Sequence, residues 1–262
     1  MLLRDNQCGF RRNRSCIDQI YSLRSIIYNC TDCNIPLYIN FIDFKAAFDS
    51  INRDFIWKAF EHYGLPSKYI RIIKAFFWNT TSAVRVNGEL FDWFPVNSGT
   101  GQGDIQGPPI FNVCLNFAAQ LAEQNKTIGK GLVLHKATSS EEDDITILDT
   151  DYADDMAVLD NSKLGLQETT DLLCKYSAYN SGLKVNASKT KTMAIHKAAG
   201  QRPFTEPCQL DITVEGNPAE QVSNFTYLGA VISSDGTLDR ELTTRIQKAS
   251  GAYHRLSRNY ME

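Results

Sequence analysis

Two acidic clusters, each following an apolar segment rich in β-forming residues, constrain the fold of this chain most strongly. Asp43 comes directly after the segment LYINFI at 37–42, and Asp154 and Asp155 follow the segment ITIL at 145–148. Both segments predict strands, so the carboxylates are expected at strand ends. Crowded carboxylates cost free energy unless a positive charge lies between them. We therefore expect Asp43 and Asp154 to lie close enough to share a cation.

A pair of Mg²⁺ ions suits these residues, with Mn²⁺ as a possible substitute. Mg²⁺ is a hard cation that takes carboxylate oxygens and substrate phosphates. Two such ions roughly 3.5–4 Å apart can activate an attacking 3′-hydroxyl and stabilise a leaving pyrophosphate. A solvated acidic loop is the alternative, and it accounts well for the charge run at 141–144. It accounts poorly for Asp154, which is soon followed by the apolar residues Met156, Ala157 and Val158.

Composition sets few further limits on function. The 262 residues carry a formal net charge of −3, and residues 141–160 hold nine carboxylates without a lysine or arginine. This balance does not exclude nucleic-acid binding, because bound cations themselves attract phosphate. Seven cysteines without a framework spacing predict reduced thiols and a nuclear or cytoplasmic protein that is not secreted. No apolar run approaches the roughly 20 residues of a membrane span.

The order of the expected elements favours an α+β fold. Helices are expected near 15–29, 54–63, 66–77, 109–123, 164–180 and 237–257. Strands are expected near 37–43, 82–88, 193 and 225–232, and two short strands of the segment 141–160 should meet at Asp154 and Asp155. Asn87-Gly88 indicates a hairpin turn. Strands and helices without strict βαβ alternation argue against a doubly wound sheet.

Six short blocks follow one another along residues 7–229. They are Gln7-Cys-Gly-Phe-Arg11 with Arg14-Ser-Cys16, Phe41–Asp49, Gly101-Gln-Gly-Asp104 through Pro108 to Phe111-Asn112, Tyr152–Asp155, Gly182–Thr190 and Tyr227-Leu-Gly229. In this order they resemble the blocks of the reverse transcriptase domain of non-LTR (LINE-like) retrotransposons. A tetrapeptide such as YADD alone is weak evidence, whereas six blocks in family order are specific.

The resemblance implies a right-hand polymerase that extends a DNA primer on an RNA template, with dNTPs as substrates. Its division of the chain gives 37–51 and 99–235 to the palm, 1–36 and 52–100 to helices of the fingers and palm, and 236–262 to the start of the thumb. The resemblance also implies that Asp43, Asp154 and Asp155 are the catalytic metal ligands. Lys189 would act as general acid on the departing pyrophosphate, and an ordinary surface lysine is the alternative.

The nucleotide pocket follows from the same resemblance. Phe48 would lie beneath the incoming sugar, where its ring leaves no room for a 2′-hydroxyl. The alternative is a core phenylalanine, which is the commonest fate of that residue. Gln102 and Gly103 would lie against the nascent base pair, since glycine permits a close approach of the backbone.

The resemblance also assigns residues to the nucleic acid. Arg11, Arg12 and Arg14 follow Phe10 closely in the sequence, a basic and aromatic mixture suited to a template strand and its phosphates. The flank of a helix N-terminus without a ligand is the alternative. Tyr227, Leu228 and Gly229 would form a primer grip that supports the 3′ end through backbone contacts.

The sequence departs from the family pattern at several places. The LSP of the family is replaced by Gln106-Gly-Pro108, and the arginine that precedes its Gln-Gly is replaced by Gly101. Only six residues precede Gln7, where the family has early fingers segments, and the thumb is short. A catalytically poor, truncated remnant that only binds nucleic acid is therefore the alternative function. An RNA-directed RNA polymerase is disfavoured by Phe48 and by the Ala-Asp pair at 153–154.

Overall fold

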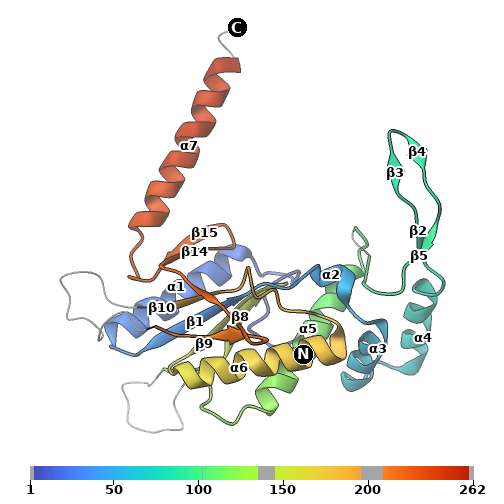
Figure 1. The fold of residues 1–262 in the computed structure, drawn as a ribbon, viewed down its shortest axis with the longest axis horizontal. Helices are drawn as coiled ribbons and strands as arrows, with labels where there is room; N and C mark the ends of the chain where they lie inside the picture. Colours follow the sequence, from blue (N-terminus) through green and yellow to red (C-terminus); the bar gives the residue numbers. More distant parts are fainter. Residues whose placement is uncertain (1–2, 102, 135–144, 196–208, 260–262) are drawn as a thin grey trace.

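A five-stranded sheet forms the centre of the fold (Figure 1). The computed structural model describes residues 3–101, 103–134, 145–195 and 209–259. The strands lie in the order β13 (Glu220–Gln221), β10 (Lys191–Ile195), β1 (Leu37–Ile42), β9 (Asp155–Asp160) and β8 (Asp149–Tyr152). All neighbours are antiparallel except β10 and β13. The mixed α+β fold expected from the sequence is confirmed.

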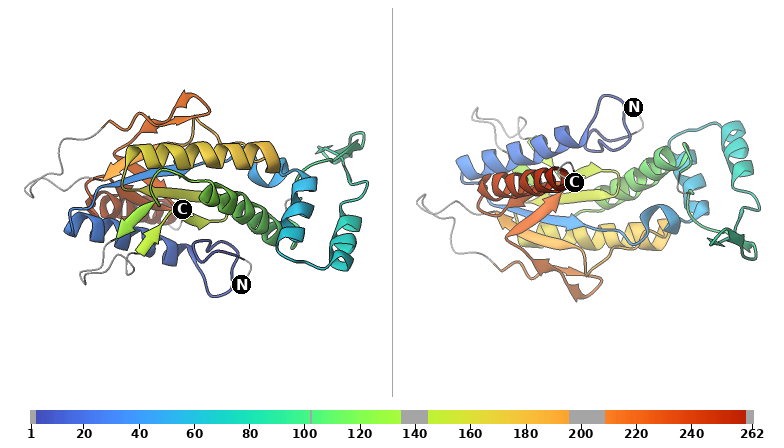
Figure 2. Two further views of the ribbon diagram at one scale, coloured as in Figure 1. Left: turned by 90° about the horizontal axis from the view of Figure 1, so that it is seen from below. Right: turned by 90° about the horizontal axis from the view of Figure 1, so that it is seen from above.

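Apolar clusters cover both faces of this sheet. Successive side chains of a strand point to opposite faces, so one strand contributes to both clusters. Along β1, Leu37, Ile39 and Phe41 belong to one apolar cluster, whereas Ile42 belongs to another. The first cluster includes helix α1 (Cys16–Asp32), and the second includes α5 (Gly107–Gln124) and α6 (Lys163–Tyr176). Figure 2 shows α1 and α6 on opposite sides of the strands.

Most of the expected elements form close to the expected bounds. The remaining longer helices are α3 (Arg53–His62), α4 (Ser67–Phe76) and α7 (Asp239–Asn259). The shorter elements are α2 (Ala47–Ser50), β6 (Leu132–Leu134), β7 (Ile145–Ile147), β11 (Thr213–Val214), β12 (Asn217–Pro218) and a π-helix at Ser177–Ser181. The part of the acidic segment at 141–144 lies outside the described residues.

The single strand expected at 225–232 is wrong. The segment forms a hairpin of β14 (Asn224–Tyr227) and β15 (Ala230–Ser233), in which Tyr227 pairs with Ala230. Leu228 and Gly229 form the turn with φ values of 49° and 84°. Two consecutive residues with positive φ fit a tight hairpin turn. Glycine adopts this conformation readily, but leucine gives no local signal for it.

Two projections leave the body of the molecule on the same side (Figures 1 and 2). One is α7. The other is a ribbon in which β2 (Thr81–Ser82) pairs with β5 (Phe94–Pro95) and β3 (Arg85–Val86) pairs with β4 (Glu89–Leu90). The expected Asn87-Gly88 turn closes the ribbon, with φ values of 51° and 90°. No helix of the described residues is long and apolar enough to cross a membrane.

A buried ion pair joins the N-terminal segment to β8. The Arg4 guanidinium donates to Asp149 Oδ2 at 2.6 Å and to Asp151 Oδ2 at 2.8 Å. Both carboxylate side chains are only 1% exposed. The backbone N–H of Arg4 also donates to Asn116 Oδ1 of α5 at 3.0 Å. Arg4 therefore supplies the positive charge for two carboxylates that are removed from water.

Replacing this arginine should destabilise the protein strongly. Arg4→Met should lower the free energy of unfolding by about 3–5 kcal/mol, because removing one partner leaves buried charge uncompensated. Urea unfolding followed by circular dichroism measures the change. Arg12→Met is the matched control, because Arg12 is an exposed arginine of the same segment. A loss of less than about 1 kcal/mol for Arg4→Met would show that the ion pair does not hold this segment.

Candidate active site

The strand pairing places the two acidic clusters at the same end of neighbouring strands. Ile42 pairs with Met156 across β1 and β9, so Asp43, the next residue, comes opposite Asp155 at the start of β9. Tyr152 pairs with Asp155 across β8 and β9, which leaves Ala153 and Asp154 as a two-residue turn. Antiparallel pairing of β9 with both β1 and β8 thus brings together carboxylates that lie more than a hundred positions apart in the sequence.

Burial and neighbouring carboxylates raise the pKa values of Asp154 and Asp155. Burial is the largest cause that raises the pKa of Asp154, and the charge of Asp43 raises it further. Burial, Asp154 and Asp43, in that order, raise the pKa of Asp155 to about 6. Like charges within a few ångströms disfavour each other's ionised forms. The site therefore has excess negative charge that a cation would neutralise.

One oxygen of this cluster lacks a partner. Oδ2 of Asp43 is buried, and no hydrogen-bond donor of the described residues reaches it. A buried acceptor left unsatisfied costs free energy, and more so when it is charged. Carboxylate oxygens of this kind are the ligands that Mg²⁺ prefers, so the residues present fit the ion.

The carboxylates do not form a closed metal cage. Within the described part of the chain, no three His, Cys, Asp or Glu side chains are grouped tightly enough to hold a metal ion. Mg²⁺ is commonly bound by one or two carboxylates, with waters and substrate phosphates completing the octahedron. An open site of two or three carboxylates therefore suits a cation that also binds a substrate phosphate.

The segment 184–190 holds the end of β1. Asn186 N–H donates to the carbonyl of Asp43 at 2.7 Å, and Asp43 N–H donates to Thr190 Oγ1 at 3.3 Å. Lys45 N–H donates to the carbonyl of Lys184 at 2.8 Å. Lys189 is an exposed residue of the same turn. The block Gly182–Thr190 is thus brought next to Asp43, although no contact places the Lys189 ammonium at the carboxylates.

Phe48, five residues after Asp43, lies in an aromatic group with Phe10 and Phe111. Its ring stacks on Phe111 of α5 at a centroid distance of 4.3 Å and meets the edge of Phe10 at 6.3 Å. Phe48 is half-buried, whereas Phe10 is 57% exposed. The ring is held in place by α5 but is not enclosed by the core.

The loop before α5 contains the other two expected pocket residues. Gln102 lies outside the described residues. Gly103 is exposed with a φ of 87°, and no atom lies within 4 Å of a Cβ built on it. Gly103 therefore has the backbone conformation that favours glycine together with open space beside it.

The two expected template arginines differ in their surroundings. The Arg11 side chain is 9% exposed, and its Nη1 donates to the carbonyls of Arg4 and Gln7, each at 2.8 Å. The Arg14 side chain is 41% exposed and lies 3.7 Å from Asp5. Arg14 thus presents its charge at the surface, whereas much of the Arg11 guanidinium is engaged by backbone.

Tyr227 of the expected primer grip is a core residue. It is 2% exposed, and its hydroxyl donates to the carbonyl of Thr150 on β8 at 3.1 Å. Burial raises the pKa of this hydroxyl above its ordinary value. Its ring lies 5.8 Å from that of Phe41. Tyr227 therefore fixes the hairpin to the sheet, and Leu228 and Gly229 form the tip of that hairpin.

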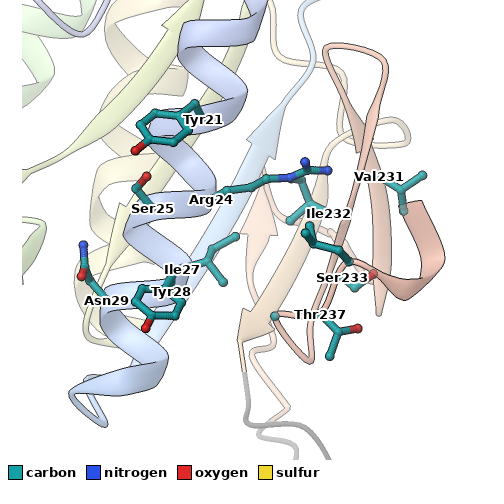
Figure 3. A pocket seen from close by; sticks show the side chains of 12 residues that line it. Tyr21, Arg24, Ser25, Ile27, Tyr28, Asn29, Val231, Ile232, Ser233 and Thr237 are labelled. Carbon is teal, nitrogen blue, oxygen red and sulfur yellow. The ribbon is translucent and has the colours of Figure 1, made fainter. Parts of the chain in front are cut away.

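A separate pocket of about 710 Å³ lies between α1 and the hairpin strand β15 (Figure 3). Arg24 extends from α1 toward β15, and its Nη2 lies 3.8 Å from Glu241 of α7. Glu241 also accepts a hydrogen bond from Val231 N–H at 2.6 Å. None of the acidic residues of the β8–β9 turn lines this pocket. The pocket lies beside the contacts of Glu241 that attach α7 to α1 and β15.

Comparisons with known proteins identify the family. The profile of the reverse transcriptase (RNA-dependent DNA polymerase) family matches residues 1–232. The chain is 26% identical over 255 residues to the RNA-directed DNA polymerase from mobile element jockey of Drosophila melanogaster, covering 93% of this chain and 24% of that protein. It is 30% identical over 258 residues to the probable RNA-directed DNA polymerase from transposon BS of the same species, covering 92% and 24%.

A further relative is the Pol polyprotein from type-1 retrotransposable element R2 of Popillia japonica, which is 22% identical over 74% of this chain and 30% of its own length. The chain thus spans less than a third of each of these relatives. It belongs to the reverse transcriptase family. The resemblance to retrotransposon reverse transcriptases seen in the sequence blocks is confirmed.

The acidic site should give the protein a measurable pH dependence. Because the folded-state pKa of Asp155 is about 6 and that of an unfolded aspartate is about 3.9, the folded protein retains a proton that the unfolded chain releases. The free energy of unfolding should therefore fall as pH rises from about 4 to about 7. Asp155→Asn should flatten this slope in urea unfolding at a series of pH values. Asp92→Asn, at an exposed position of the ribbon, should not, and equal slopes for the two variants would contradict the expectation.

Proposed function

We propose that this chain is the RNA-directed DNA polymerase domain of a non-LTR retrotransposon. It would extend a DNA 3′-hydroxyl on an RNA template, consuming dNTPs and releasing pyrophosphate. Family membership supports this function. The observation that carries it is the unpartnered buried oxygen of Asp43 beside the raised-pKa carboxyls of Asp154 and Asp155.

Asp43 and Asp154 would hold two Mg²⁺ ions, or Mn²⁺ in their place, with Asp155 adjacent. When bound, such ions activate the attacking hydroxyl and neutralise charge on the leaving group. The backbone bonds of Asn186 and Thr190 to Asp43 would keep its carboxylate in one position. Lys189 would give a proton to the departing pyrophosphate from the same turn.

The remaining residues would select and align the substrates. Phe48 would exclude the 2′-hydroxyl of a ribonucleotide, and its stacking on Phe111 would keep the ring rigid. Gln102 and Gly103 would lie against the new base pair. These roles give the pocket its preference for dNTPs.

The nucleic acid would lie on the side to which α7 and the ribbon project. Arg11 and Arg14 would face the template, and Tyr227, Leu228 and Gly229 would support the primer end. In this proposal 37–51 and 99–235 form the palm, 1–36 and 52–100 contribute fingers and palm helices, and 236–262 begins the thumb. A nuclear or cytoplasmic location suits these partners.

Removing a carboxylate should abolish extension. Asp43→Asn and Asp154→Asn should each lower primer extension on an RNA template by about 10³-fold or more, because metal-ion stabilisation of the transition state contributes several kcal/mol. Asp92→Asn should retain activity. Extension that survives in both site variants would contradict the proposal. A wild-type chain that binds an RNA–DNA hybrid without extending it would support the alternative of a nucleic-acid-binding remnant.

Phe48 offers a test of sugar selection. Phe48→Val should raise rNTP incorporation relative to dNTP on the order of tenfold or more, because a steric wall is removed. Single-nucleotide extension with each substrate measures the ratio. Phe55→Val is the matched control, because Phe55 is a buried phenylalanine of α3 that stacks on Phe117 instead. An unchanged ratio in Phe48→Val would make Phe48 a core residue only.

A further inference from the structure

The turn that carries Asp154 is held by the buried side chain of Gln7. Gln7 is 1% exposed. Its Oε1 accepts hydrogen bonds from the N–H groups of Ala153 at 2.8 Å and Gly9 at 2.7 Å. Its Nε2 donates to the carbonyl of Ala153 at 3.2 Å. One amide thus satisfies both backbone groups of the residue next to Asp154.

The turn needs such support because of its backbone conformation. Ala153 has a φ of 56°, in the left-handed region that residues with a Cβ rarely adopt. It is also buried, so its N–H and carbonyl require partners within the protein. Strained residues of this kind persist only where the surroundings determine them. The Gln7 amide provides that determination.

The whole segment around Gln7 is fitted to this turn. Cys8 N–H donates to the carbonyl of Asp151 at 2.8 Å, and Asp151 N–H donates to that of Asn6 at 3.0 Å, so the segment lies along the free edge of β8. A Cβ added to Gly9 would lie 2.2 Å from Ala153 N. Only glycine permits this approach.

The opposite side of the segment is also fixed. Asn112 Nδ2 of α5 donates to the carbonyl of Gly9 at 2.6 Å. Gln7 and Gly9 are therefore held between α5 and the β8–β9 turn. Displacing the turn would therefore break its contacts with Gln7 and Gly9.

We propose that Gln7 is a positioning residue that fixes the Ala153–Asp154 turn and thereby sets the affinity of the carboxylate pair for divalent cations. The inference rests on the proposed function only in taking Asp43 and Asp154 as the cation ligands. Without the amide, Ala153 leaves the left-handed conformation, and the Asp154 carboxylate moves away from Asp43. Groups that orient a metal ligand through a second contact commonly change metal affinity by about 10–100-fold.

The test is Mn²⁺ binding to the metal-free 262-residue chain, followed by the electron paramagnetic resonance signal of free Mn²⁺. Gln7→Met, which keeps the length of the side chain but removes its amide, should weaken binding by about tenfold or more. Gln19→Met is the matched control. Gln19 is also buried, at 3% exposed, and its Nε2 donates to the carbonyls of Asn6 and Asp151 at 2.8 and 3.0 Å. Asp151 lies two residues before Ala153, so Gln19 does not bond to the turn itself. The Mn²⁺ affinity of Gln19→Met should therefore stay within about twofold of that of the wild type.

A rescue variant separates positioning from a general loss of stability. Adding Ala153→Gly to Gln7→Met should recover a large part of the lost affinity, because glycine adopts a positive φ without strain. Urea unfolding of every variant shows that each is folded where binding is measured. Wild-type affinity in Gln7→Met, or an equal loss in Gln19→Met, would overturn the inference.

Failure of the proposed function gives a different result. Mn²⁺ binding that is the same in the wild type and in Asp43→Asn would overturn the proposed cation site, and the inference with it. Asp43-dependent binding that Gln7→Met leaves unchanged would overturn the inference alone.

Discussion

The antiparallel pairing of β1 with β9 is the interaction on which the rest of the site depends. It sets Asp43 opposite Asp155 and brings both next to the turn that carries Asp154. Burial of these carboxylates and the repulsion among them oppose the pairing, and both raise the pKa values of Asp154 and Asp155. Burial of apolar side chains on both faces of the strands offsets this cost. The sheet therefore holds the carboxylates in an arrangement that is unfavourable without a compensating positive charge.

Two segments that are distant in the sequence fix the backbone around the three carboxylates. Residues 184–190 bond to the backbone of Asp43, and residues 6–9 bond to β8 and to its turn. The buried pair of Arg4 with Asp149 and Asp151 fastens the second segment. Hydrogen bonds thus hold the backbone at Asp43 and the backbone at the β8–β9 turn. Residues from several of the sequence blocks contribute hydrogen bonds to the backbone around the carboxylates.

Elements that depend on neighbouring residues, such as capped helices, tight turns and apolar strands, could be predicted from the sequence. Helix α1 begins after Ser15, whose hydroxyl accepts from Asp18 N–H while the Asp18 carboxylate accepts from Ser15 N–H. The Asn87-Gly88 turn and strand β1 likewise follow from adjacent residues. The one-turn helix α2 was not foreseen, because it follows Ala46 with a φ of 45° that no local pattern indicates. The turn at Leu228 was missed for the same reason.

The sequence predicted which carboxylates form the candidate site but not the contacts that hold them. Carboxylates at strand ends indicated that Asp43, Asp154 and Asp155 would meet, and their cation-binding role stays a prediction. The role of Gln7 could not be read from the sequence, because its amide meets Ala153 across 146 positions. The primer-grip role of Tyr227 stays a prediction, and the contact of its hydroxyl with β8 in the core gives no signal in the sequence. Contacts between distant segments decide such cases, and a single sequence does not contain them.

The central claim is that Asp43 and Asp154 share a divalent cation. Anomalous diffraction from crystals of the protein grown with Mn²⁺ tests it most directly. We predict an anomalous peak within roughly 2.5 Å of a carboxylate oxygen of each residue, as oxygen ligands of divalent cations require. A peak at exposed carboxylates elsewhere, with none between Asp43 and Asp154, would contradict the account.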